Sequence, residues 1–150
     1  MTSDFFAPIG LTGPYFDECD FYVRKETPKG NLLLDLDLDI PTEQEYTDED
    51  GNLTLIHEMR LRVSLNEVLD DERTSEAMHA SVSMKGAVSV PLDVQASRSD
   101  LEAYLLLNAI SLFYSSARSY IDALSAQSPM GRFTIPAIDP KKYLDMAKGM

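Results

Sequence analysis

The chain has 150 residues, of which 44% are hydrophobic and 25% are charged, a composition typical of a globular domain rather than a disordered or membrane-spanning chain. Its 25 acidic and 13 basic residues leave a net charge of −12, which argues against nucleic acid as a partner because phosphate backbones require a basic patch. The single cysteine, Cys19, excludes an internal disulfide and a cysteine-based zinc site. The first residues lack the basic region and apolar core of a signal peptide. We therefore expect one cytoplasmic domain, residues 1–150, with no membrane insertion.

The negative charge is concentrated in the N-terminal third. Residues 1–50 hold 13 acidic and 3 basic residues, whereas residues 101–150 hold 4 acidic and 5 basic residues. Such a distribution either keeps the protein soluble or steers a basic partner to one face, and the sequence leaves both readings open.

The first two strand signals precede residue 41. A short extended segment is expected at Phe16 to Lys25. The run from Asn31 to Ile40 reads NLLLDLDLDI, in which apolar and acidic residues alternate with a period of two. This pattern predicts a strand with one buried and one solvated face, the solvated face carrying Asp35, Asp37 and Asp39. Arg60 and Arg62 on the next strand are expected opposite these carboxylates.

Two longer strands follow. Leu53 to Leu69 and Glu76 to Val90 both alternate, and the dipeptide Asp50-Gly51 predicts a turn that closes an acidic loop after Pro41. The predicted inner faces consist of Leu53, Leu55, Met59, Leu61, Val63 and Leu65 on the first, and of Met78, Ala80, Val82, Met84, Val88 and Val90 on the second. Short connections favour antiparallel pairing of consecutive strands.

A long helix is predicted from Ser99 to Gln127, beginning with a capping box formed by Ser99 and Glu102. Its apolar residues cover almost every direction around the axis, so we expect protein on more than one side of it. The apolar run is shorter than the ~20 residues that cross a bilayer. A chain of this length offers few layers, and we therefore expect a second copy of the chain or a bound client to supply one of them, with an oligomer as the default.

The remaining element is a short C-terminal helix. Asp139 and Pro140 are typical of a cap and first-turn pair, and the helix is expected to extend through Lys148. The predicted fold is α+β: a four-stranded antiparallel sheet packed on one long helix, with a short C-terminal helix, in an oligomer.

No catalytic or metal-binding motif is recognisable. His57 and His79 lie in strands without metal-ligand spacing, so we interpret both as structural. Calcium-loop frames counted from Asp35 or Asp48 lack the required glycine and glutamate. Glycine-rich phosphate loops and a GxSxG elbow are also missing. We expect no cofactor and no enzymatic activity.

The C-terminal third resembles the SecB protein-export chaperones, in which a helix carrying Phe-Pro-Tyr-Ala-Arg precedes Gly-x-Phe and Pro-x-x-Phe. The matching residues are Tyr114-Ser115-Ser116-Ala117-Arg118, Ile121, Gly131-Arg132-Phe133, Ile138, Pro140 and Tyr143. Ser115 and Ser116 replace Pro-Tyr, and about three extra residues follow Arg118. At the family's docking positions for the translocation ATPase SecA the chain has Asp20, Arg24, His79 and Ser81, of which only Asp20 is acidic.

The resemblance implies a homotetrameric holdase, a dimer of dimers, that needs neither ATP nor cofactor and keeps unfolded preproteins export-competent in apolar grooves. Docking of SecA is implied at Asp20, with Asp35, Asp37 and Asp39 as further acidic candidates. Arg118 is interpreted as structural, linking the helix to the returning chain. Because methionine and aromatic side chains suit an adaptable surface, the candidate client-binding residues are Phe21, Tyr22, Met59, Met78, Met84, Phe113, Tyr120, Phe133, Ile135, Tyr143, Leu144 and Met146.

Two alternative functions stay open. A SecB-like scaffold devoted to one partner, such as a toxin–antitoxin chaperone, would bind one protein and no unfolded chains. An oligomeric enzyme of unknown chemistry would require a cleft with convergent polar groups.

Overall fold

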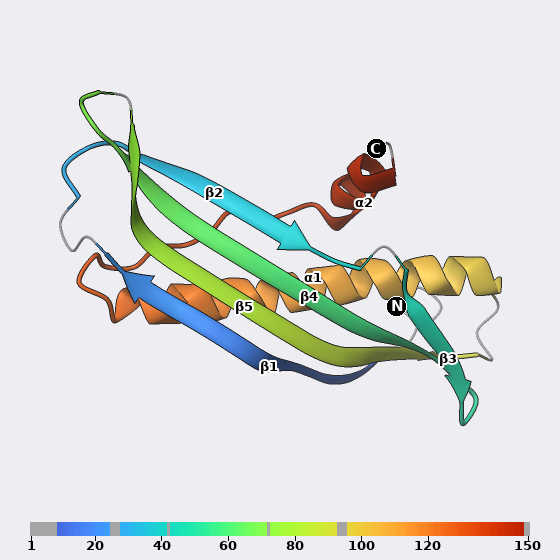
Figure 1. Cartoon of the computed structure of the whole chain (residues 1–150). Coiled ribbons are helices and arrows are strands. Elements are labelled where there is room, and N and C mark those ends of the chain that lie inside the picture. The colour runs from blue at the N-terminus through green and yellow to red at the C-terminus, as the bar shows by residue number, and fades with distance from the viewer. Residues whose placement is uncertain (1–8, 25–27, 42, 72, 93–95, 149–150) are drawn as a thin grey trace, which may run out of the picture.

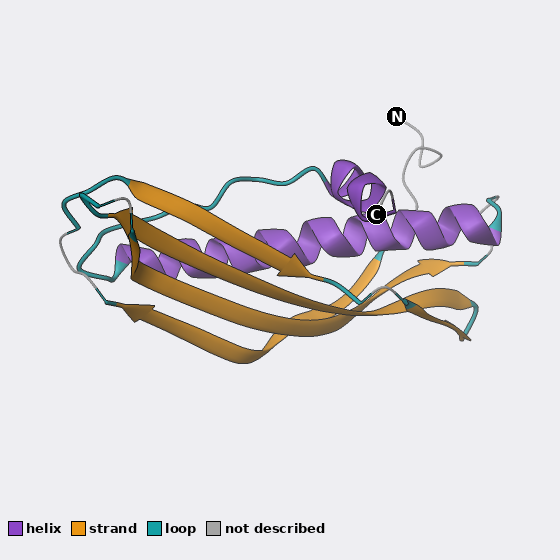
Figure 2. Cartoon of the chain, turned by 45° about the horizontal axis from the view of Figure 1, so that its top comes forward, coloured by secondary structure: helices purple, strands orange, loops and turns teal. Residues whose placement is uncertain are grey.

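The computed structural model describes residues 9–24, 28–41, 43–71, 73–92 and 96–148. Its elements are β1 (Gly10–Val23), β2 (Leu32–Asp39), β3 (Glu45–Glu49), β4 (Asn52–Val68), β5 (Thr74–Pro91), α1 (Arg98–Ala126) and α2 (Pro140–Lys148). One long, twisted antiparallel sheet lies against α1, which covers a single face of it (Figures 1 and 2). The predicted α+β class, the long helix and the C-terminal helix are confirmed.

The described sheet has five strands rather than the four we expected. Its order is β1-β5-β4-β2, and β3 pairs with the first part of β4 (Figure 1). The predicted turn at Asp50-Gly51 is present, with φ of 53° and 77°, and positive φ at both central residues is the geometry of a two-residue hairpin. The acidic loop after Pro41 therefore contains half of a hairpin.

β1 is longer than the predicted segment Phe16 to Lys25, of which residue 25 lies outside the described residues. It begins at Gly10 and pairs with β5 through two register irregularities, between Thr12 and Tyr15 and between Phe16 and Glu18. Such irregularities break the period of two, and this is why the sequence pattern does not reveal the whole strand.

The core lies between β4, β5 and α1. Both predicted inner faces are confirmed, since all twelve residues assigned to them are at most 4% exposed. The aromatic ring of Phe113, in the middle of α1, meets the ring of His57 edge-on at a centroid distance of 4.8 Å. At the facing position of β5, a Cβ on Gly86 would lie 2.9 Å from Phe113 Cζ and 2.6 Å from the Thr12 carbonyl oxygen. Only glycine fits this contact between strand and helix.

The N-cap of α1 lies two residues before the predicted cap at Ser99. Ser97 is the N-cap, because its Oγ accepts a hydrogen bond of 3.1 Å from the Asp100 amide. Arg98 then binds both carboxylate oxygens of Asp48, at 2.8 and 2.7 Å, and so ties the start of α1 to β3. Ser99 has the right spacing to Glu102, but Ser97 makes the cap, so the helix starts earlier than predicted.

The residues after α1 form a segment, residues 131–138, that returns along the helix (Figures 1 and 2). Arg118 Nε donates to the Ile135 carbonyl at 2.7 Å, and Tyr114 donates its hydroxyl to the Pro136 carbonyl. Ser125 Oγ accepts from the Phe133 amide at 2.7 Å. The interpretation of Arg118 as a structural link is thus confirmed, and the chain itself covers part of a second flank of α1.

One side of α1 is exposed, so the helix is less completely surrounded by protein than its apolar sequence predicts. Its sheet side is fully buried, whereas Ser111, Ser115 and Ser119 recur every four residues on an exposed side next to Leu112, which is 36% exposed. A second copy on this side of α1 remains a prediction.

Replacing Arg118 by alanine is expected to lower the free energy of unfolding by about 1.5–3 kcal/mol, because the buried Ile135 backbone loses a charged hydrogen-bond donor. Urea denaturation measures the loss, and hydrogen exchange at the Phe133 amide should quicken. Arg132→Ala serves as the control, since this exposed residue only approaches Asp122 at 3.6 Å. Equal effects of the two substitutions would contradict the structural assignment of Arg118.

Candidate functional site

An apolar surface lies where β2 borders the sheet. Leu34, Leu36 and Leu38 alternate along β2 on the side of the sheet that faces α1, and the two leucines nearer to α2 are less accessible than the first. Leu34 is 37% exposed, whereas Leu36 and Leu38 are half-buried and pack against the core. Leucine side chains in this position leave apolar area that a further chain can cover.

The short helix α2 closes one end of this surface. Asp139 caps it, because its Oδ1 accepts from the amides of Lys141 and Lys142 at 3.0 and 3.2 Å. Tyr143 and Leu144 are half-buried against the core, and the Tyr143 hydroxyl donates to the Leu38 carbonyl at 3.2 Å. We call the resulting surface the apolar strip; it consists of Leu34, Leu36, Leu38, Tyr143 and Leu144.

The candidate client-binding residues do not form one surface. Five of them lie in the core at 0–2% exposure, where a client has no access in this conformation: Met59, Met78, Met84, Phe113 and Ile135. Phe21, Tyr120 and Phe133 are half-buried and pack against the core elsewhere, and Tyr120 stacks on Phe16 of β1 at 4.8 Å. Tyr143 reaches β2 through its hydrogen bond to Leu38, Leu144 is half-buried on the same helix, and Met146 there is 72% exposed.

Sequence reasoning did not assign the leucines of β2 to the site. Their alternation predicts burial, and burial was expected from α1. β2 instead lies at the border of the sheet, so its inner face is only partly covered. The position of β2 at the border follows from the order of the strands, and the alternation of residues within a strand does not encode that order.

The four candidate docking carboxylates are exposed on the outer face of the sheet, away from α1, but on two different borders. Asp35, Asp37 and Asp39 lie on β2, whereas Asp20 lies on β1, with β5 and β4 between them. As expected, Arg62 pairs with Asp37 across the strands, Nη1 to Oδ2 at 3.5 Å. Arg60 stands opposite Asp39 in register but pairs with Glu18 at 3.5 Å instead.

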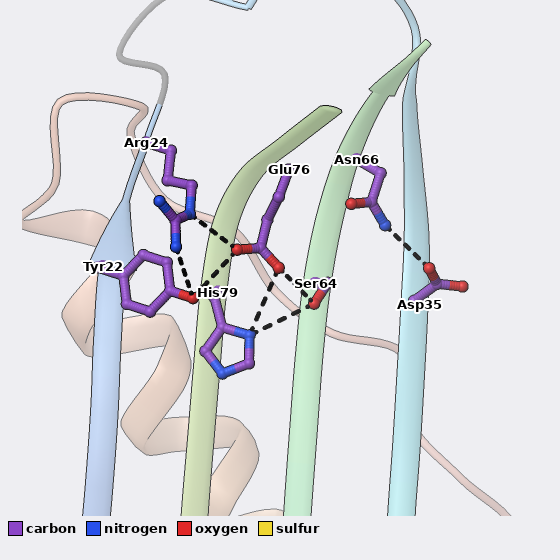
Figure 3. A network of polar contacts seen from close by, with 7 residues as sticks. All are labelled: Tyr22, Arg24, Asp35, Ser64, Asn66, Glu76 and His79. Atoms are coloured by element: carbon purple, nitrogen blue, oxygen red, sulfur yellow. Dashed lines mark hydrogen bonds and ion pairs between the residues drawn. The ribbon is translucent and has the colours of Figure 1, made fainter. Parts of the chain in front are cut away.

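A polar network occupies one end of the outer face, across β1, β5 and β4 (Figure 3). Glu76 accepts hydrogen bonds from Tyr22 at 3.1 Å and from Arg24 at 3.0 Å, and Ser64 and His79 approach its second oxygen. Burial raises the pKa of Glu76, but the hydrogen bonds from Arg24 and Tyr22 outweigh it and bring the pKa below its ordinary value. Tyr22 thus belongs to this network rather than to the apolar strip.

The outer face also contains a cavity of about 490 Å³ between β1 and the end of β2. The register irregularity at Asp17 directs two consecutive acidic residues toward it, so that Asp17 reaches Lys85 and Glu18 reaches Arg60, at 3.6 and 3.5 Å. Its lining carries more acidic than basic groups: Asp17, Glu18, Asp39, Glu58, Arg60 and Lys85.

Within the described residues, no group of three or more histidine, cysteine, aspartate or glutamate side chains is arranged to hold a metal ion. Nor does any helix in that part of the chain combine the length and the apolar character needed to cross a membrane.

The comparison with solved structures finds a similar fold. The chain superposes on a SecB-like chaperone of Mycobacterium tuberculosis, solved in complex with a ChAD peptide from the HigA1 antitoxin, with a TM-score of 0.59 and 13% sequence identity, covering 87% of this chain and 90% of that one. A protein of unknown function from Streptococcus agalactiae matches at a TM-score of 0.44 and 11% identity, over 87% and 98% of the two chains. No family model and no curated protein sequence matches. The first likeness establishes a SecB-like fold.

Proposed function

We propose that the protein is a cytoplasmic, ATP-independent holdase that binds unfolded preproteins and keeps them competent for export. The observation that carries the proposal is the apolar strip, a surface of leucine and tyrosine side chains only partly covered by α2. The SecB-like fold supports it, because a chaperone of that fold was solved with a peptide bound.

The proposed mechanism is thermodynamic. A protein that binds the unfolded form of a client and not its native form lowers the free concentration of the aggregation-prone species. Apolar side chains suit this task, because covering the exposed third of a side chain such as Leu34 contributes roughly 0.5–1 kcal/mol whatever the sequence of the client. The proposed contacts are the apolar strip together with Met146, rather than the core methionines.

We further propose that the active form is an oligomer, a dimer of dimers. Phe16, Cys19 and Leu112 are exposed at the sheet border β1 and on α1, although Phe16 stacks on Tyr120. A second copy would cover these groups. Asp20, Asp35, Asp37 and Asp39 are the proposed docking residues for a basic partner, with the SecA ATPase as the candidate that the family resemblance implies.

A dedicated scaffold is the alternative function. The similar structure holds a peptide of one antitoxin, which favours a partner-specific chaperone over a general one. Such a protein would bind a single partner with high affinity and would leave unrelated unfolded chains to aggregate.

The test is the aggregation of a thermally unstable client, followed by light scattering without nucleotide. The wild-type protein should keep the client soluble, and Leu34→Ser should weaken its client affinity roughly threefold because the strip loses one leucine that is 37% exposed. Leu33→Ser is the matched control, since Leu33 is the neighbouring residue on the outer face and is 51% exposed. Aggregation that proceeds unchanged with the wild-type protein would refute the holdase.

A further inference from the structure

The arginines of this acidic chain pair with carboxylates, with one exception. Of the seven arginines, six form an ion pair with an aspartate or glutamate: Arg24, Arg60, Arg62, Arg73, Arg98 and Arg132. Arg118, half-buried on α1, forms no ion pair with the described residues. Its positive charge is therefore left for an anion that this part of the chain does not supply.

The guanidinium of Arg118 is held in place by the chain that returns along α1. Its Nε donates to the Ile135 carbonyl at 2.7 Å. An arginine has five N–H donors, so the four on Nη1 and Nη2 remain for a ligand. These donors form a planar fork that matches the two oxygens of a carboxylate. Because the fork is already oriented, a ligand that binds it orders little of the side chain.

Arg118 lines a cavity of about 340 Å³ between α1 and the returning chain, together with Ser115, Ser119, Asp122 and Thr134. Ser115 and Ser119 are exposed, and their hydroxyls have no hydrogen-bond partner among the described residues. A serine hydroxyl can donate to an anion. The cavity therefore offers two hydroxyl donors beside the guanidinium, in a volume typical of small-ligand sites.

The acidic residue of the lining, Asp122, is already engaged by other groups. Its Oδ1 accepts a hydrogen bond from the Thr134 hydroxyl, and its Oδ2 lies 3.6 Å from Arg132 Nε. Asp122 and Arg132 thus compensate each other, and the charge of Arg118 is left over. A single positive charge suits a monoanion, because a dianion such as phosphate would place excess negative charge beside Asp122. The charges therefore favour a carboxylate as the ligand.

We propose that this cavity binds a carboxylate group, held by the two Nη atoms of Arg118 and by the hydroxyls of Ser115 and Ser119. The site goes beyond the proposed holdase function and is independent of it, since the apolar strip lies on β2 and α2. The carboxylate belongs either to a free small acid or to the C-terminal end of a polypeptide, which share this chemistry. The surface proposed for a second copy, at Phe16 and Leu112, lies across the serines from Arg118.

The test follows the Arg118 Nε–H and Ser119 amide signals of the full chain by heteronuclear NMR at constant ionic strength. The probes are propionate, the peptide acetyl-Gly-Gly-Ala with a free C-terminus, and the same peptide with a C-terminal amide. We expect both acids to shift these signals with dissociation constants of about 1 mM. The amide should bind at least tenfold more weakly, because it lacks the charge that the guanidinium fork recognises. No shift with either acid, or equal binding of acid and amide, overturns the proposal.

Comparison of the two acids identifies the source of the carboxylate. Binding of the peptide acid at least tenfold more tightly than propionate supports the site as one for polypeptide ends, whereas similar affinities support it as one for small acids. Inorganic phosphate should bind more weakly than propionate at the same ionic strength. Tighter binding of phosphate would contradict the assignment to a monoanion.

Two serine variants separate local binding from the net charge of the protein. Ser119→Asp places a competing carboxylate in the lining and should weaken propionate at least tenfold. Ser111→Asp is the matched control, because Ser111 is also exposed on α1 but does not line the cavity, and it should leave the affinity within about twofold. Equal weakening by both variants would reduce the effect to net charge and overturn the proposal.

The aggregation assay keeps this proposal distinct from the holdase. Ser119→Asp should protect an unstable client as well as the wild type does, since the apolar strip is unchanged. If the assay fails while propionate binds, then the holdase is refuted and the carboxylate site stands.

Discussion

Replacing Phe113 by alanine is expected to lower the free energy of unfolding by about 3–5 kcal/mol. Phe113 is completely buried in the middle of α1, against the edge of the His57 ring and over the backbone at Gly86. Truncating the ring opens a cavity between helix and sheet that the glycine position does not fill. Chemical denaturation followed by circular dichroism measures the effect.

Leu112→Ala is the control for this prediction. Leu112 precedes Phe113 on the same helix but is 36% exposed, so its truncation should change the free energy of unfolding by less than about 1 kcal/mol. If the two substitutions destabilise the protein equally, then the centre of α1 is not anchored to the sheet as described.

Lowering the pH from about 6.5 to about 4 is expected to cost up to about 3 kcal/mol of stability through His57 alone. Burial lowers the pKa of His57 from 6.5 to about 4, and its Nε2 is buried without a hydrogen-bond partner in the described residues. Between the two pKa values the unfolded chain binds the proton and the folded chain does not. The contribution is therefore complete above about pH 6.5 and is lost as the pH falls toward 4.

A His57→Leu variant isolates this contribution, because the carboxylates titrate alike in both proteins. The free energy of unfolding of the wild type should fall relative to that of the variant, by up to about 3 kcal/mol, as the pH is lowered from 6.5 to 4. Gln44 lies 3.3 Å from His57 Nδ1 and is the polar neighbour that the variant leaves behind. A difference that is constant over this range would contradict the burial of a neutral imidazole.

Alternation predicts the centre of the fold because β4 and β5 are covered on one face over most of their length; the exception is Ala77, which is buried beside Met78 at a register irregularity. Each of Leu53 to Leu65 and Met78 to Val90 follows the same period of two that the structure displays. The helix is equally well predicted in type, although its first residue, Arg98, forms an ion pair with Asp48 of β3. The two residues are 50 positions apart in the sequence, so no local sequence pattern predicts their contact.

The border of the sheet could not be predicted in the same way. The acidic segment Glu45–Glu49 has the composition of a solvated loop, yet it forms β3 because β4 extends beyond β2 and offers it a partner. The leucines of β2 alternate as those of β4 do. Among the described strands, however, β2 has a paired strand on one side only, whereas β4 has paired strands on both sides. Strand order therefore decides which apolar residues become a candidate site.

For methionine, residue type and strand phase point to different places. Flexible thioethers suit an adaptable surface, whereas Met59, Met78 and Met84 lie in the core. Strand phase already put them on the inner face, and this phase is a stronger signal of burial than residue type. The candidates nearest β2 came instead from α2, where Tyr143 was singled out by its position after Pro140.

The central claim is that the protein recognises unfolded polypeptide and ignores native protein, without nucleotide. The most direct measurement is the dissociation constant for a fluorescently labelled disulfide protein in two forms, native and permanently unfolded by reduction and alkylation. We predict binding of the unfolded form at about micromolar concentration or below, no measurable binding of the native form, and no effect of added ATP. Equal affinity for the two forms, or no binding of the unfolded one, would contradict the account.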